Sequence, residues 1–454
     1  MPPALFPHNV LCMPRKLLLS NLIAALLASF ATPVSAETLT QAVARAVARF
    51  PEIQGARSRR EATEAQVGQA RAEFLPSVNA SLGEGRETSN NSNTRALGAD
   101  PTLTRQEADI VVSQLLFDGG AVTGQVWRFG ARVKGAGYAV SNTALSVALR
   151  AGQAFIEVYR LREQLKIAHE NVATHERSLG DVTALADAGR GRRADVVQAE
   201  ARLALARSAV QQQDGQLRQA EATYRYLTGV VPGELDAPGQ LASALPAQIE
   251  PGLDQALDTH PAILAAKQEF DAAQFDRDSA RARRVAPRVT LEAGASRNRD
   301  LDGVRGANDD HYVMLRLRYN LFRGFGDDER VRETQARIAE ALSEIERARN
   351  EVERDIRQAW DALASDRARL PQLDRYARAS ADVAAAYRAQ FQLAQRSLLD
   401  VLNAENERYN ALNGFIAGRA AVTAGEIRLL ASLGRLMEAL GITVPEEAAR
   451  ERTP

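Results

Sequence analysis

The sequence predicts a mainly α-helical protein with a small β part, built as a duplicated helix-strand-strand-helix repeat. Three observations lead to this prediction: an internal repeat at a nearly constant offset, four segments with the periodicity of strands, and helical stretches too long for a compact globule. Alanine, arginine, glutamate, glutamine and leucine dominate, and aromatic residues make up 5% of the chain. This composition is typical of long helices packed through small residues rather than of an enzyme core.

The N-terminus has the features of an export signal. Arg15 and Lys16 precede a largely apolar run at residues 17–31, and Val34-Ser35-Ala36 supplies the small residues of a cleavage site. A transmembrane anchor is the alternative, but the run is short for a bilayer and ends at a proline. The sequence therefore predicts a signal peptide over residues 1–36.

Cysteine content and charge narrow the class further. The single cysteine, Cys12, precedes the apolar run, so cleavage would leave a chain without cysteine; Met13 is an alternative start. Such a chain is not a disulfide scaffold, and it lacks the cysteine that lipoprotein attachment needs. The chain has 57 basic and 57 acidic residues, and loss of the two basic leader residues leaves a slight acidic excess. We therefore expect no nucleic-acid partner.

The internal repeat fixes the predicted organisation. Leu116-Phe117-Asp118-Gly119 aligns with Leu321-Phe322-Arg323-Gly324 at an offset of 205, and Asp195-Val196 aligns with Asp400-Val401 at the same offset. Such self-similarity indicates two copies of one structural unit. The predicted division is a signal peptide at 1–36, a first repeat at 37–230, a linker rich in proline and glycine at 231–249, a second repeat at 250–440 and a C-terminal tail at 441–454.

Four segments have the two-residue period of strands. In the clearest case, Val313, Leu315 and Leu317 alternate with a methionine and two arginines, so that apolar and polar side chains fall on opposite faces. The segment with Ile110, Val112 and Leu116 is less regular. The predicted strands span about 77–85, 108–117, 288–297 and 311–322.

The length of these strands suits a tilted crossing of an outer membrane. A half-buried strand in a soluble sheet has the same period, but the loops at residues 86–107 and 297–310 are long and polar, as extracellular loops usually are. Four strands cannot close a barrel, and open edges cannot face lipid, so more than one copy is required. Arg316 and Arg318 would then line the lumen; on a soluble sheet they would be solvated.

Very long helices are predicted after each strand pair. No proline lies between Gly120 and Pro232, and residues 327–395 would span about 100 Å as one helix. Valines recur every seven residues from position 133 to position 147, as in coiled coils. Each long helix is followed by a tip, at about 188–195 and about 394–400. A soluble coiled coil is the alternative for these segments taken alone.

The duplicated order, together with Arg396-Ser397-Leu398-Leu399-Asp400-Val401-Leu402-Asn403-Ala404-Glu405, resembles the TolC-like outer membrane factor family. Tyr319 to Gly324 and Gln390 to Asp400 are most similar to the type I secretion branch. The resemblance implies a homotrimer in the outer membrane of a Gram-negative bacterium, with a shared 12-stranded barrel on a coiled-coil periplasmic tunnel. It implies a passive duct that meets a periplasmic adaptor and, through it, an inner-membrane ABC transporter.

The cargo implied by that branch is a large adhesin or an RTX-type protein. Two alternatives stay open from the sequence: a drug or small-molecule efflux duct of the same fold, and a secreted coiled-coil structural protein without a pore. No Gly-x-Ser-x-Gly, His-Glu-x-x-His or phosphate-loop motif occurs, and the five histidines lack metal-site spacing. The sequence therefore predicts no enzyme, no catalytic residue, no cofactor and no metal.

The resemblance also implies a periplasmic gate at the tips. By motif, Asp195 and Arg396 resemble residues that join neighbouring coils through charge-assisted hydrogen bonds, while Asp400 and Asn403 resemble two inward rings. Phe391 replaces a tyrosine of some members, so a hydroxyl bond is missing, and Asn403 replaces an aspartate, so its ring would be neutral. Helix capping is the alternative role for Asp195 and Asp400.

Two small residues mark the places where an adaptor would approach the backbone of the tips. Gly189 lies in the first tip and Ala394 in the second. For Gly189, a simple turn glycine is an equally good interpretation.

Overall fold

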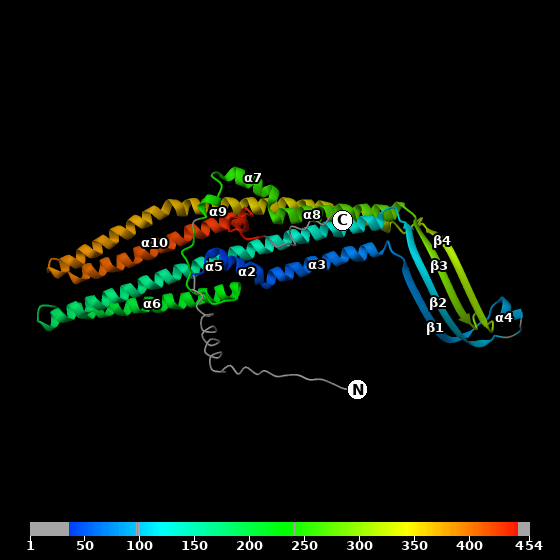
Figure 1. Cartoon of the computed structure of the whole chain (residues 1–454), viewed down its shortest axis with the longest axis horizontal. Helices are drawn as coiled ribbons and strands as arrows, with labels where there is room; N and C mark the ends of the chain where they lie inside the picture. Colours follow the sequence, from blue (N-terminus) through cyan, green and yellow to red (C-terminus); the bar gives the residue numbers. More distant parts are fainter. Residues whose placement is uncertain (1–35, 97, 99, 240, 444–454) are drawn as a thin grey trace, which may run out of the picture.

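The computed structural model describes residues 36–443 apart from 97, 99 and 240. The chain is an elongated rod of long helices that ends on one side in a four-stranded sheet, with two helical hairpins pointing the other way (Figure 1). The predicted signal peptide, except for Ala36, and residues 444–454 of the predicted tail lie outside the described residues.

The two repeats have equivalent elements in the same order, which confirms the duplicated, mainly helical fold. The first repeat contains α2 (Leu39–Arg49), α3 (Pro51–Ala72), β1 (Ser77–Thr88), α4 (Ser92–Ala96), β2 (Thr102–Phe117), α5 (Ala121–Asp187) and α6 (Arg193–Thr228). The second contains α7 (Ile249–Thr259), α8 (Pro261–Val285), β3 (Arg288–Arg299), β4 (Ala307–Arg318), α9 (Gly326–Gln392), α10 (Leu398–Ser432) and α11 (Leu436–Ala439). The short helices α4 and α11 have no counterpart in the other repeat, and η2 (Ala242–Ala244) lies in the linker.

The long helices α5 and α9 have 67 residues each, which corresponds to about 100 Å. α9 continues through Pro371 without a break. Small residues allow close helix packing: a Cβ on Gly124 of α5 would lie 3.0 Å from the Cβ of Ser279 on α8. The predicted heptad valines Val140 and Val147 are fully buried.

The helices form a layer one helix thick. Near the sheet, α3 packs on α5, α5 on α8 and α8 on α9, which is the same order as the strands. Toward the tips the order becomes α6, α5, α10 and α9. Apart from a small contact between α6 and α10, the helices of each series pack only on their neighbours in it, so among the described residues the layer has two free edges.

Apolar clusters hold this layer together at two levels. In the middle of the rod, α2, α5, α6, α10 and α11 surround Phe155, Tyr224 and Leu430, all fully buried. A smaller cluster at the tips joins the two hairpins through Val182, Val196, Ala199, Leu398 and Leu402.

The sheet is antiparallel with strand order β1-β2-β3-β4. β1, β2 and β3 extend further into polar sequence than expected, because backbone pairing continues beyond the apolar pattern, as far as Thr88 opposite Thr102. β4 ends at Arg318 rather than at residue 322, because Arg318 pairs with Arg288, the first residue of β3. The residue before Arg288 is a proline, which has no N–H to extend the ladder.

The irregular pattern of β2 has a local cause. The register between β2 and β3 shifts between Leu115 and Phe117, which leaves Leu116 as an extra residue in a bulge. Phe117, not Leu116, therefore pairs with Val289 of β3.

His260 is a buried titratable residue at the start of α8. Its buried side chain is the N-cap of α8, where Nδ1 accepts a hydrogen bond from the Ala262 N–H at 3.2 Å. Burial lowers the pKa of His260 and the negative charge of Asp355 partly offsets this effect. A protonated Nδ1 could not accept the bond, so the neutral form is the one that caps the helix.

We expect the protein to become less stable when the pH falls from about 7.5 to about 5.5. The pKa of His260 is lower in the folded than in the unfolded protein. The stability that its neutral form contributes is therefore fully present above the unfolded pKa and decreases as the pH falls toward the folded pKa, by at most about 1.4 kcal/mol per pH unit for this residue. His260→Asn keeps an acceptor but does not titrate, so its thermal midpoint should change less with pH. His169→Asn, on the exposed side of α5, is the control; an equal slope in all three proteins would contradict the assignment.

Candidate functional site

The sheet has one apolar and one polar face. Residues paired directly across strands share a face, so the register assigns every side chain. Rows of mainly aliphatic side chains alternate with rows of mainly polar ones along the strands. One apolar row is Val78, Val112, Ala293 and Val313. The adjacent row, one residue along each strand, is mainly polar and contains Ser77, Ser113, Glu292 and Met314.

None of the described residues outside the sheet covers its apolar face. Leu82 is 87% exposed, Val313 76% and Leu315 65%. Soluble monomers rarely expose a contiguous apolar surface that follows four strands, so this face requires a partner that is itself apolar. A lipid bilayer satisfies that requirement for a sheet whose opposite face is polar.

The polar face carries ordered contacts. Tyr312 lies over Gly294, where a Cβ would be 2.5 Å from the tyrosine ring. The carboxylate of Glu292 accepts from Arg316 Nε at 2.7 Å and from a terminal nitrogen of Arg318 at 2.8 Å. The structure therefore brings together the two arginines singled out from the sequence and adds a glutamate that sequence reasoning missed. Their place in a lumen stays a prediction.

Each outer strand of the sheet pairs on one side only within the described residues. β1 pairs with β2 and β4 pairs with β3, which leaves the backbone groups along the other side of both strands without a strand partner. Such edges cannot be placed in lipid, since each unsatisfied backbone group costs several kcal/mol there. The sheet can enter a membrane only when further strands cover both edges.

Aromatic side chains surround the junction between sheet and helices. Tyr319, Phe322 and Phe325 are at least half exposed, and the rings of Phe322 and Phe325 meet edge to face at 5.3 Å. Trp127 of α5, about half exposed, lies against Phe275 of α8 at 5.6 Å. Aromatic girdles of this kind mark the level of the membrane-water interface in outer-membrane barrels.

The two tips have the same backbone conformation. At the first tip, Gly189 N–H donates to Ala186 O and Arg190 N–H donates to Leu185 O; at the second tip, Ala394 and Gln395 repeat this pattern at the offset of 205. These pairs of bonds define a Schellman helix end, which needs a left-handed residue. Gly189 has φ +73° and Ala394 φ +59°, so an alanine occupies a conformation that favours glycine.

The second tip is ordered around Arg396. Its Nε donates to Gln390 Oε1 at 3.1 Å, its guanidinium lies 4.1 Å from the centroid of the Tyr387 ring, and Asp400 is 3.9 Å away. Ser397 caps α10 by accepting from the Asp400 N–H at 3.3 Å and donating to the Asp400 carboxylate at 2.9 Å. Asp400 therefore takes part in helix capping, the alternative role considered for it.

Asp195 occupies the equivalent first turn of α6. Over the described part of the chain its carboxylate makes no hydrogen bond or ion pair, and the structure does not bring it to Arg396 of the same chain. Phe391 packs against the apolar cluster at the tips. Asn403 accepts from Arg202 of α6 at 3.1 Å, so it links the two hairpins. The gate roles of these residues stay predictions.

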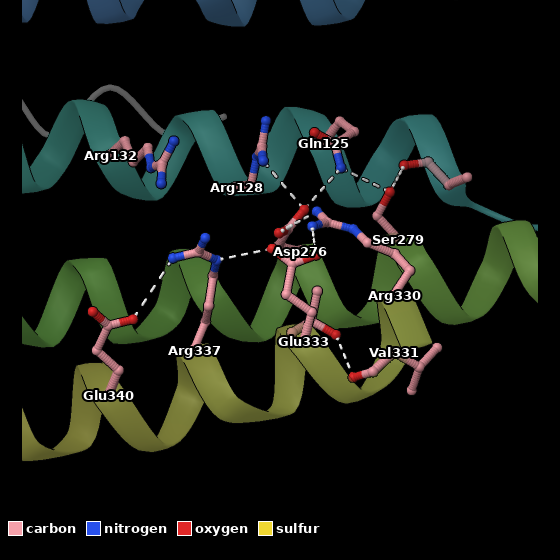
Figure 2. A network of polar contacts seen from close by, with 12 residues as sticks. Gln125, Arg128, Arg132, Asp276, Ser279, Arg330, Val331, Glu333, Arg337 and Glu340 are labelled. Atoms are coloured by element: carbon pink, nitrogen blue, oxygen red, sulfur yellow. Dashed lines mark hydrogen bonds and ion pairs between the residues drawn. The ribbon is translucent and has the colours of Figure 1, made fainter. Parts of the chain in front are cut away.

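A buried carboxylate joins three helices near the sheet, as Figure 2 shows. Asp276 of α8 accepts from Gln125 of α5 at 3.3 Å, Arg128 of α5 at 3.2 Å and Arg330 of α9 at 2.9 Å. Burial lowers the pKa of Arg128, and Asp276 opposes that shift. Sequence reasoning missed this node, although Asp276 stands at helical spacing between the buried Ala272 and Ser279.

A second buried carboxylate, Glu405, lies on α10. It is fully buried, accepts from Arg408 of the same helix at 3.0 Å and pairs with Arg388 of α9. Burial lowers the pKa of His175 on α5, and the negative charge of Glu405 partly offsets this effect. Polar side chains thus occupy the seam between the hairpins above the apolar tip cluster.

These features define a class. An amphipathic sheet with two open edges, continuous with a helical layer that also has two open edges, belongs to proteins that build a membrane-inserted duct from several copies. No helix among the described residues combines the length and apolar character needed to cross a bilayer.

Comparison with known proteins agrees with this class. The family model "Outer membrane efflux protein" matches residues 42–230 and 252–435. The chain is 26% identical over 421 residues to the outer membrane efflux protein BepC of Brucella suis, covering 91% of this chain and 89% of BepC. It is 30% identical over 339 residues to the protein CyaE of Bordetella pertussis, covering 73% and 70%.

A solved structure shows the same fold. The outer membrane channel CmeC of Campylobacter jejuni superposes with a TM-score of 0.76 at 14% identity, covering 98% of each chain. The present chain belongs to the outer membrane efflux protein family, which is a family of channels and not of enzymes. It is therefore an outer membrane channel protein that extends into the periplasm, as the sequence predicted.

Proposed function

We propose that the chain forms a homotrimeric duct for type I protein secretion. The observation that supports the assembly into a duct is the pair of open edges that run along the sheet and the helical layer together. When β4 of one copy pairs with β1 of the next, three copies complete a 12-stranded barrel. The apolar face then meets lipid and the polar face lines the lumen.

The helical edges support the same assembly. Leu342, Tyr376 and Val383 of α9 are exposed at one edge, while Val197 and Leu205 of α6 are exposed at the other. A head-to-tail contact that closes into a ring would bury these side chains between neighbouring copies. A head-to-tail ring joins two different surfaces of the subunit, and here these would be the α6 edge and the α9 edge of the helical layer.

We place the partners at the tips, since these point away from the sheet (Figure 1). Around Gly189 the first tip carries the exposed residues Arg190, Arg192 and Arg193, and beside Ala394 the second exposes Leu393. A periplasmic adaptor would dock on these tips and connect the duct to an inner-membrane ABC transporter. The energy for export would come from that transporter, because the duct itself is passive.

The branch rests on two sequence segments, Tyr319 to Gly324 and Gln390 to Asp400, which resemble type I secretion members. The name of BepC, an efflux protein, favours small-molecule efflux as the second candidate. A deletion strain distinguishes them. Loss of one large secreted protein with unchanged drug tolerance supports secretion, whereas hypersensitivity to drugs with a normal secreted-protein pattern supports efflux.

We expect Arg396→Ser to raise the single-channel conductance of the purified protein in planar bilayers. The unpartnered Asp195 of one copy lies on α6 at a free edge and can receive Arg396 of the neighbour as a charge-assisted bond. Removing this latch would relax the constriction. Arg190→Ser, an exposed arginine of the first tip, is the matched control and should leave the conductance unchanged. Equal conductance of wild type and Arg396→Ser would rule out the latch.

A further inference from the structure

We propose that the duct carries an anion filter at the base of its barrel, formed by Arg288, Arg316 and Arg318 and tuned by Glu292. This inference rests on the proposed function, because the polar face must line a shared lumen. It assigns to these residues the ion selectivity of that level of the duct.

The three arginines gather at one level of the polar face. Arg288 pairs with Arg318 across β3 and β4, and Thr290 pairs with Arg316 in the next row of the same face. Arg288 and Arg318 are exposed and Arg316 is half-buried, and all three occupy the end of the sheet that joins the helices. Their guanidinium groups would therefore reach the lumen just above the helical tunnel.

Glu292 neutralises one of these charges and holds two of the side chains. Its nearly buried carboxylate accepts from both Arg316 and Arg318, at 2.7 and 2.8 Å. The side chain of Arg288 makes no hydrogen bond or ion pair among the described residues. Three arginines less one glutamate leave two positive charges in each copy, and hence six around a trimer.

The surroundings do not cancel this charge. At the same level the polar face carries Ser77, Ser113 and Met314, which are neutral. Acidic groups just beyond the strands are committed elsewhere: Asp118 accepts from N–H groups at the start of α5, and Asp328 pairs with Arg284 at 2.6 Å.

The charge pattern changes sign along the duct. Further out on the polar face, Asp109 and Asp310 bring negative charge, whereas Glu107 pairs with Arg105. Rings of charged side chains select ions by their sign. The basic level would thus favour anions below an outer level of the sheet that favours cations.

Screening of the arginine charges by salt determines the salt concentration at which the filter can be tested. The Debye length is about 10 Å at 0.1 M salt and about 30 Å at 0.01 M, so a ring around a wide lumen acts on passing ions chiefly in dilute salt. The filter therefore predicts an ion selectivity that weakens as KCl rises. A purely structural role of the arginines predicts no such salt dependence.

The experiment measures the reversal potential of purified trimers in a KCl gradient near 0.01 M. Arg288→Gln, and more strongly Arg288→Gln/Arg318→Gln, should lower the chloride-to-potassium permeability ratio by about twofold or more. Glu292→Gln should shift it the opposite way, because it adds one net positive charge per copy. Arg318→Lys keeps the charge and should retain the wild-type ratio.

Arg297→Gln is the matched control, because Arg297 lies on β3 but on the apolar face, opposite Asp309. It should leave the ratio unchanged. A wild-type ratio in Arg288→Gln and in the double variant, or a shift of Glu292→Gln toward potassium, would overturn the filter alone. Absence of any conductance in the wild-type protein would instead overturn the proposed function, and the filter with it. Because Arg288 has no partner, its single variant tests the filter even where the double variant does not assemble.

Discussion

Replacing both Val313 and Leu315 with arginine is expected to abolish insertion of the assembled protein into the outer membrane. Both side chains lie on the apolar face of β4 and are largely exposed within the chain. An arginine at the lipid face costs about 2–4 kcal/mol near the bilayer midplane, and the assembly would carry two of them in every copy. The measurement is the amount of heat-resistant oligomer in the outer-membrane fraction.

The residue between these two provides the control. Met314 lies on the polar face, in the row of Glu292, so Met314→Arg adds an arginine to the same strand but toward the lumen. We expect Met314→Arg to insert normally. Normal insertion of the double variant, or an equal defect of Met314→Arg, would contradict the assignment of the two faces.

Asp276→Ala is expected to lower the free energy of unfolding by about 2–4 kcal/mol per chain. The substitution leaves Arg128, which is half-buried between α5 and α8, without its anionic partner, and it removes the contact from α8 to Arg330 of α9 (Figure 2). Loss of one member of a buried, hydrogen-bonded charge pair is far more costly than loss of a surface ion pair. Chemical denaturation in detergent, followed by helical circular dichroism, measures the change.

A nearby acidic residue tests whether burial is the cause. Glu333 of α9 also pairs with Arg330, at 2.6 Å, but on the exposed side of the helix. Its hydrogen bond with Arg330 holds the pKa of Glu333 below the ordinary value. Glu333→Ala should nevertheless cost much less stability than Asp276→Ala, because solvent screens an exposed pair. Similar losses for both variants would show that Asp276 acts as a surface charge.

Local patterns predicted the elements better than their ends. The alternation from Val313 to Leu317 identified β4 and its two faces, since side-chain direction in a strand has a period of two. The same pattern placed the end of β4 at residue 322, whereas the strand ends at Arg318. Strand ends depend on the backbone partner, here Arg288 after a proline, and a partner about thirty residues away leaves no local signal.

The contacts between the two repeats could not be predicted. Asp276 meets a helix 148 residues away in the chain, and Asn403 meets Arg202 at a separation of 201 residues. Both contacts depend on how the helices pack and not on local spacing. The first tip, by contrast, had a local signal in Gly189, while the left-handed Ala394 was accessible only through alignment of the repeats.

Disulfide cross-linking between β1 and β4 tests the central claim most directly. The single cysteine of the sequence lies in the predicted leader, so a mature chain would carry only the introduced ones. We would place one cysteine at Ser81 and scan a second along residues 308–316, because both strands are edges of the sheet. Oxidation in membranes should link chains of the double-cysteine variant up to a trimer and no further. The control variants with only one of the two cysteines should give no product larger than a dimer. A monomer at every position, or a ladder that continues past three chains, would contradict a closed ring in which each copy contributes four strands.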